Sequence, residues 1–144
     1  VSVTCIVSQG LDMTLAPGTW AVGSVAEGAT SSTFNTVNQG YFTVTNNANG
    51  TSYMDISASI SGGMSIGGAA GVNIFRVGHG QATGSEPNTI EAVSYTALTG
   101  SDANLATIAS LGTYKFDLQL KAPTSTTFGG VQQIITVTVT AKTS

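Results

Sequence analysis

The sequence predicts an all-β sandwich of the Ig-like or jelly-roll type, and three observations predict it. Short runs of alternating apolar and polar residues recur along the chain, as in strands with one buried face. Turns that contain glycine or proline separate these runs at short intervals, which is typical of sandwiches. The length of 144 residues suits one domain with a core of its own. We therefore expect residues 1–144 to form a single β-sandwich domain.

The first third of the chain contains three expected strands. Residues 1–8 alternate apolar residues with serine and threonine, so they are expected to form a strand with one apolar face. A second short alternating run covers residues 11–15 and ends at Pro17-Gly18, and a looser strand follows around Trp20. The apolar face of the first strand consists of Val1, Val3, Cys5 and Val7.

The middle third is expected to contain more strands. Alternation over residues 41–45 and 54–61 predicts two strands. The Asn- and Gly-rich turn at 46–50 is expected to join them as a hairpin, since both residue types tolerate positive φ angles. Residues 61–71 are rich in glycine, which suits either a loop or a distorted strand close to another backbone. Further strands are expected at 72–77 and 90–95, separated by a turn-prone stretch at 78–87.

The last third combines one candidate helix with the clearest strands. A helix is expected over residues 102–111, because Asp102 can cap it and Leu105, Ile108 and Leu111 recur at near-helical spacing. Alternation predicts strands at 114–121 and 132–141. The intervening loop suggests that these two strands are antiparallel neighbours.

Charge and hydropathy exclude two classes of partner. Only 8% of the residues are charged, against about 25% in an average soluble protein. With four basic residues and a net charge of −3, the chain has no basic stripe for nucleic acid. It also lacks the run of about 20 apolar residues that a membrane span needs. The chain opens on Val1 rather than Met, as expected if a targeting segment is removed, so we expect an extracellular or cell-surface protein.

The side chains that support catalysis are sparse. The single histidine, His79, lies between glycines in an expected turn, and no G-x-S-x-G motif accompanies it, so a surface position is expected. No H-E-x-x-H or Asp-rich loop is available for zinc or calcium. Two carboxylates facing across a cleft would allow glycoside hydrolysis, but solvated strand and loop charges are the expected role of the acidic residues. We expect no enzyme activity, no cofactor and no metal site.

Three other features have two interpretations each. Cys5, the only cysteine, is expected to be a buried thiol rather than a cross-link to another chain. Asn49-Gly50-Thr51 is the only N-x-S/T sequon, which makes Asn49 a candidate glycosylation site on an exposed turn. Trp20 is expected in the core, but it could instead form a carbohydrate-binding platform with the tyrosines. The four tyrosines are Tyr41, Tyr53, Tyr95 and Tyr114.

The first strand suggests a mode of assembly. A strand at the N-terminus, followed by Gly10, can leave its own domain and pair with the open sheet edge of a neighbour. Repeated head to tail, such a contact does not close and gives a filament. The other interpretation is an ordinary strand within its own domain. The predicted subunit interface is the apolar face of this donor strand, Val1, Val3, Cys5 and Val7.

Several short motifs resemble a known group of proteins. Residues 11–15, 18–23, 42–47, 116–120 and 133–141 are similar to secreted prokaryotic fibre and pilus subunits of the TasA/camelysin and archaeal bundling-pilin type. This resemblance implies a homopolymeric extracellular filament in which an N-terminal donor strand completes the next subunit. The protease label of camelysin-like proteins is not carried over, because the chain has no matching metal motif. The alternatives are a carbohydrate-binding or adhesive surface module, with surface glycans as partners, and a jelly-roll viral capsid or decoration protein.

Overall fold

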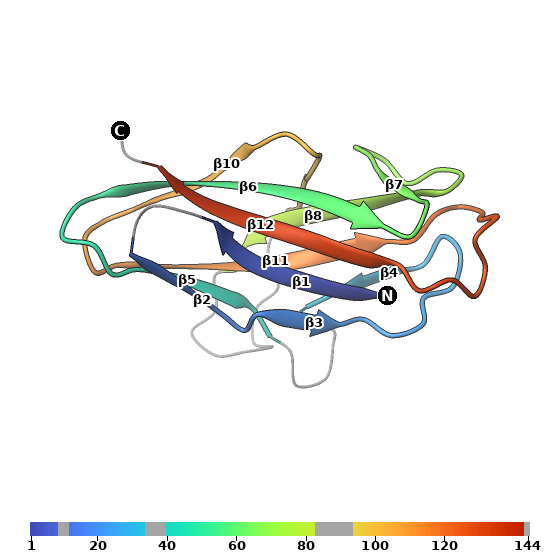
Figure 1. Cartoon of the computed structure of the whole chain (residues 1–144), viewed down its shortest axis with the longest axis horizontal. Helices are drawn as coiled ribbons and strands as arrows, with labels where there is room; N and C mark the ends of the chain where they lie inside the picture. Colours follow the sequence, from blue (N-terminus) through green and yellow to red (C-terminus); the bar gives the residue numbers. More distant parts are fainter. Residues whose placement is uncertain (9–11, 34–39, 83–93, 143–144) are drawn as a thin grey trace.

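The protein folds into two β-sheets that pack face to face as a sandwich (Figure 1), which confirms the predicted fold class. The computed structural model describes residues 1–8, 12–33, 40–82 and 94–142. In spatial order, the first sheet contains β10 (Ala103–Ile108), β6 (Ser52–Ser61), β12 (Ile134–Lys142), β1 (Ser2–Ser8) and β3 (Thr19–Ala21). The second contains β2 (Met13–Ala16), β5 (Phe42–Asn46), β11 (Thr113–Lys121), β8 (Ile74–Gln81) and β7 (Ser65–Ile66), with β4 (Thr30–Ser32) paired to β11 and β9 (Thr96–Ala97) paired to β8.

The described segments include no helix that is long and apolar enough to cross a membrane.

The core lies between the sheets and follows the alternation of the sequence. In β12, Ile135, Val137 and Val139 are fully buried, and the threonines between them are only half-buried. On the second sheet, the rings of Phe42 and Phe116 stack with their centroids 5.5 Å apart. These side chains belong to one cluster that joins both sheets, and burial of such apolar surface is the main term that stabilises the fold.

The first strand is integrated into this sandwich. β1 lies between β12 and β3. It runs parallel to β12 over seven residues, from Ser2 opposite Ile134 to Ser8 opposite Thr140, and antiparallel to β3 from Ser2 to Thr4. In the single chain, therefore, the predicted donor strand pairs within its own domain.

Two predicted hairpins are wrong, because their strands belong to different sheets. The turn at 46–50 connects β5 of the second sheet to β6 of the first, and none of its residues has a positive φ angle. Asn46 stabilises this connection instead, since its Nδ2 donates to the Gly50 carbonyl oxygen (2.8 Å). In the same way, β11 and β12 are not neighbours, and the chain between them crosses from one sheet to the other. Alternation identifies the buried face of a strand but not its partner.

The predicted helix over 102–111 is also wrong, because β10 occupies most of this segment. β10 pairs with β6, and the register shifts between Asn104 and Ala106, which is a β-bulge. The extra residue, Leu105, lets both Leu105 and Ile108 point into the core. A bulge in a strand thus imitates the spacing of three residues that is typical of a helix.

The glycine-rich middle of the chain gives mixed outcomes. Residues 61–71 combine a bend at Gly62-Gly63, both with positive φ, and the short strand β7, which runs parallel to β8. β8 continues through Gln81, so the predicted turn at 78–87 is wrong for its first four residues. Most of the strand predicted at 90–95 lies outside the described residues, and β9 begins at Thr96.

Candidate functional site

The predicted interface face of β1 points into the core. Val3 is fully buried and Cys5 is 5% exposed, while Val1 is partly buried and packs against the same cluster. The backbone of Val7 pairs with Val139, but the Val7 side chain lies outside the described part of the chain. Ile6, on the opposite face, is 43% exposed. β1 thus presents its side chains in the alternation that a donor strand requires.

The Cys5 thiol is a packing group. It is free and buried, which confirms the preferred interpretation from the sequence. Burial raises its pKa to about 12. Because the thiolate is the reactive form, a thiol in this environment is inert at neutral pH.

A cavity of about 380 Å³ lies at the end of the sandwich where β1 begins. Val1 lines it, together with parts of three connections: residues 23–27 between β3 and β4, Met64 between β6 and β7, and residues 122–133 between β11 and β12. Figure 1 shows these connections near the N-terminus, at one end of the two sheets. The volume of the cavity lies within the range of small-molecule sites, about 300–1,000 Å³.

Two hydrogen bonds, one between backbone groups and one to a side chain, hold the walls of this cavity in place. The Gly28 N–H donates to the Pro123 carbonyl oxygen (2.7 Å), and the Thr126 N–H donates to Oε1 of Glu27 (2.9 Å). These bonds tie the β3–β4 connection to the β11–β12 connection. The cavity is therefore a preformed feature of the fold, with Glu27 held at its exposed rim.

Gly62 and Gly63 allow the connection between β6 and β7 to approach the cavity wall closely. A Cβ atom at Gly62 would lie 2.5 Å from Oε1 of Gln133, and one at Gly63 would lie 2.7 Å from Cε1 of Phe128. Both glycines have positive φ angles of 113° and 96°. Gly62 therefore contacts Gln133, and Gly63 contacts Phe128, at distances that only glycine permits.

Gln133 is the polar group at the inner end of the cavity wall. It is 3% exposed, and its Nε2 donates to the carbonyl oxygens of Gly62 (3.1 Å) and Val131 (3.2 Å). Its Oε1 has no donor within hydrogen-bonding distance among the described residues. This oxygen is closed off from solvent beside Gly62, and a buried acceptor without a partner costs free energy. The sequence analysis missed this cavity, and the Gly62-Gly63 pair is the signal that could have indicated a close approach.

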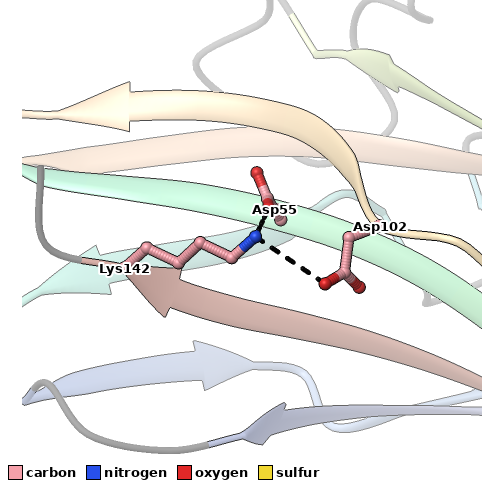
Figure 2. Close-up of polar contacts among 3 residues, drawn as sticks. All are labelled: Asp55, Asp102 and Lys142. Atoms are coloured by element: carbon pink, nitrogen blue, oxygen red, sulfur yellow. Dashed lines mark hydrogen bonds and ion pairs between the residues drawn. The ribbon is translucent and has the colours of Figure 1, made fainter.

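Two carboxylates and one amine meet on the outside of the first sheet. Lys142 of β12 forms an ion pair with Asp55 of β6, and its Nζ lies 3.7 Å from Oδ2 of Asp102, just before β10 (Figure 2). The hydrogen bond to Asp55 raises the pKa of Lys142, so the amine stays protonated. The side chains of Lys142 and Asp102 are about half exposed. The cluster is a solvated electrostatic contact between three neighbouring strands.

His79 is buried, which corrects the predicted surface position. It lies in β8 opposite Leu118, is 8% exposed, and faces inward like Val77. Neither ring nitrogen has a hydrogen-bond partner among the described residues, and burial lowers the pKa of His79, so the ring is neutral. The apolar surroundings of the inner face of β8 disfavour the charged form of the ring, which explains why this histidine is neutral.

Asp117 is buried as well, so its prediction as a solvated charge is wrong. Its Oδ1 accepts a hydrogen bond from Oγ1 of Thr33 (2.9 Å), and the residue is 2% exposed. Asp117 pairs with Gly80 while His79 pairs with Leu118, so the two side chains lie on opposite faces of the second sheet. They do not form the acid and base of a catalytic triad. Outside the gaps at 9–11, 34–39, 83–93 and 143–144, no three His, Cys, Asp or Glu residues cluster as metal ligands would.

The aromatic platform considered for polysaccharides is not formed. Trp20 is fully buried, which confirms its predicted core position. Tyr53 is 42% exposed on the first sheet, whereas Tyr114 is half-buried on the second. The Tyr41 ring lies beneath Nζ of Lys115, which is 4.7 Å from the ring centroid. Aromatic side chains on different sheets do not form one flat binding surface.

Asn49 is exposed on the connection between β5 and β6, so its role as a glycan acceptor stays a prediction.

Comparisons with known proteins gave no match: no protein-family model, no curated protein and no solved structure matches this chain. The resemblance to prokaryotic fibre subunits therefore stays a prediction that rests on short motifs.

Proposed function

We propose that the protein is a structural subunit of an extracellular filament or pilus, assembled head to tail by donor-strand exchange. In this assembly, β1 of one copy takes the place of β1 in the next copy. The observation that carries the proposal is that β1 supplies Val3 and Cys5 to the core while pairing with both β12 and β3. A strand that is bordered on both sides and inserts side chains into the core leaves a complementary groove when it departs.

The energetics of exchange support this assignment. The β1 of another copy offers the same backbone register and the same buried side chains, so a swapped subunit keeps the contacts of the closed one. The free energy of assembly then depends on the connection after β1 and on new contacts between subunits. Sparse charge, 8% of residues, limits repulsion when identical copies pack closely.

A disulfide that locks β1 into its own domain tests the proposal. Thr4 and Thr19 face each other in the antiparallel register of β1 and β3. The Cys5 N–H donates to the Gly18 carbonyl oxygen (2.8 Å), which marks the adjacent pair as the hydrogen-bonded one. Thr4 and Thr19 are therefore a non-hydrogen-bonded pair, with Cα atoms about 4.5 Å apart, and this spacing accepts a disulfide.

The double variant Thr4→Cys/Thr19→Cys is compared with itself in its oxidised and reduced forms. We expect the reduced protein and the unmodified chain to form filaments that negative-stain microscopy detects, and the oxidised protein to stay monomeric in size-exclusion chromatography. The native thiol of Cys5 does not interfere, because it is buried and protonated. Filaments of equal length and number from both forms, or monomers from both forms and from the unmodified chain, would contradict exchange of β1.

A further inference from the structure

We propose that Asn49 is a site of spontaneous modification, at which the side-chain amide is lost and an isoaspartyl linkage to Gly50 forms as the protein ages. The sequence contains no other asparagine that is followed by glycine. This inference goes beyond the filament function and does not depend on it, because the reaction takes place within one connection of a single chain.

The reaction needs a backbone nitrogen that can reach the side chain before it. The Gly50 nitrogen attacks Cγ of Asn49, the bond from Cγ to Nδ2 breaks, and ammonia leaves with the proton of the attacking N–H. A cyclic imide remains, and water opens it at either carbonyl. Opening at Cγ gives aspartate, whereas opening at the main-chain carbonyl gives isoaspartate, in which the main chain runs through Cγ. Water is the only co-reactant, and a glycine allows the close approach because it has no Cβ.

Three asparagines lie together at this end of the sandwich, and the structure distinguishes them. Asn46 is fully buried. The N–H that follows Asn47 belongs to Ala48 and donates to Oδ1 of Asn46 (3.0 Å), a hydrogen bond that must break before this nitrogen can attack. The Gly50 N–H has no acceptor among the described residues, and both Asn49 and Gly50 are exposed. Of the three, Asn49 alone combines an exposed amide with a following nitrogen that can attack it.

Asn46 turns this modification into a change of stability. Its side chain holds the connection on both sides of Asn49, because Oδ1 accepts the Ala48 N–H (3.0 Å) and Nδ2 donates to the Gly50 carbonyl oxygen (2.8 Å). An isoaspartyl linkage adds one carbon atom to the main chain between these two contacts. The longer chain displaces the Gly50 carbonyl from Nδ2, so the isoaspartyl form is less stable than the unmodified protein. The aspartyl form keeps the normal main chain and its stability.

Ageing of the purified protein, made in a host without N-glycosylation, tests the proposal. Isoelectric focusing separates the product, because it carries one more negative charge than the net −3 of the unmodified chain. Peptide mapping by mass spectrometry locates the change, and a protein isoaspartate methyltransferase detects the isoaspartyl form. We expect conversion at Asn49 well before Asn47, several-fold faster at pH 8 than at pH 6. The isolated isoaspartyl form should melt at a lower temperature than fresh protein, whereas Asn49→Asp should not.

Gly50→Ala separates the reaction from the fold. A Cβ atom at Gly50 meets nothing within 4 Å, and the φ angle there is not positive, so alanine fits without strain while its methyl group hinders the attack. This variant should convert several-fold more slowly. Gly129→Ala, at an equally open position, is the matched control and should convert at the unmodified rate. Thr51→Ala removes the glycosylation sequon, keeps the Asn-Gly pair, and should also leave the rate unchanged.

Four outcomes would overturn the proposal. They are an Asn49 that stays intact in the folded protein while a free peptide of residues 46–52 converts, equal rates at Asn49 and Asn47, an unchanged rate in Gly50→Ala, and an isoaspartyl form as stable as fresh protein. None of these results bears on the exchange of β1, which the disulfide variant tests separately.

Discussion

Replacing Asn46 by aspartate removes the side-chain donors that tie two connections together, the one between β5 and β6 and the one between β10 and β11. Asn46 is fully buried at the end of β5, and its Nδ2 lies within hydrogen-bonding distance of the carbonyl oxygens of Gly50 (2.8 Å), Ile108 (3.1 Å) and Ala109 (3.1 Å). Two hydrogens serve these three acceptors. The substitution Asn46→Asp keeps the shape of the side chain but turns an oxygen toward the carbonyls.

The expected loss follows from the buried acceptors. Each buried polar group left without a partner costs about 1–3 kcal/mol, so removing two N–H donors lowers the free energy of unfolding by about 2–6 kcal/mol. The Oδ1 contacts with the Ala48 N–H (3.0 Å) and the Ser52 hydroxyl (3.2 Å) remain, so the expected loss of stability comes from the missing Nδ2 donors. Protonation of the new carboxyl restores one donor, and the loss should therefore be smaller at pH 4 than at pH 7.

Guanidinium unfolding followed by tryptophan fluorescence measures this loss, because Trp20 is fully buried in the native state. Asn49→Asp is the matched control, since Asn49 is exposed on the same connection between β5 and β6. It should change the free energy of unfolding by no more than about 0.5 kcal/mol, as surface substitutions do. Equal losses in the two variants, or a loss at Asn46 below about 1 kcal/mol, would refute the view that this amide holds the connections together.

Three further predictions follow from other parts of the sandwich. Burial lowers the pKa of His79, so just below pH 6.5 the unfolded state takes up a proton at this ring and the folded state does not. The free energy of unfolding should therefore fall as the pH drops from 7.5 to 5.5. Denaturant titrations of His79→Leu should show a smaller dependence on pH. Gly63→Ala should destabilise by about 1–3 kcal/mol because of its positive φ and its contact with Phe128, whereas Gly129→Ala, where a Cβ meets nothing within 4 Å, should be neutral in thermal unfolding. Lys142→Gln should lower the melting temperature slightly at low salt and not at 1 M salt, and a salt-independent loss would contradict a solvated ion pair.

Alternation was a good guide to burial but not to strand pairing. It placed β6 and β12 correctly, because both are long strands with one face in the core. It could not show that the chain changes sheets after Asn46 and again after Lys121, since a connection between sheets and a hairpin use the same turn residues. The helix predicted over 102–111 failed for a local reason, the bulge at Leu105, which changes the phase of a strand.

The candidate site was only partly accessible from the sequence. The inward face of β1 was predictable, because Val3 and Cys5 sit at alternate positions. The cavity was not, since its wall depends on the orientation of the Gln133 amide, which is fixed by carbonyls from separate connections. The position of His79 was missed because flanking glycines favour a turn in isolation, whereas tertiary pairing with β11 holds them in a strand.

The parallel pairing of β1 with β12 also sets an order of events during folding. β1 is the first strand of this chain to be synthesised, but its long partner is the last, so almost the whole chain must be made before the two can meet. At about 5–20 residues per second, synthesis of the intervening chain takes on the order of ten seconds. Contacts so distant in sequence also form slowly. Throughout this interval, β1 has no β12 of its own, and a finished β12 on a neighbouring chain can compete for it.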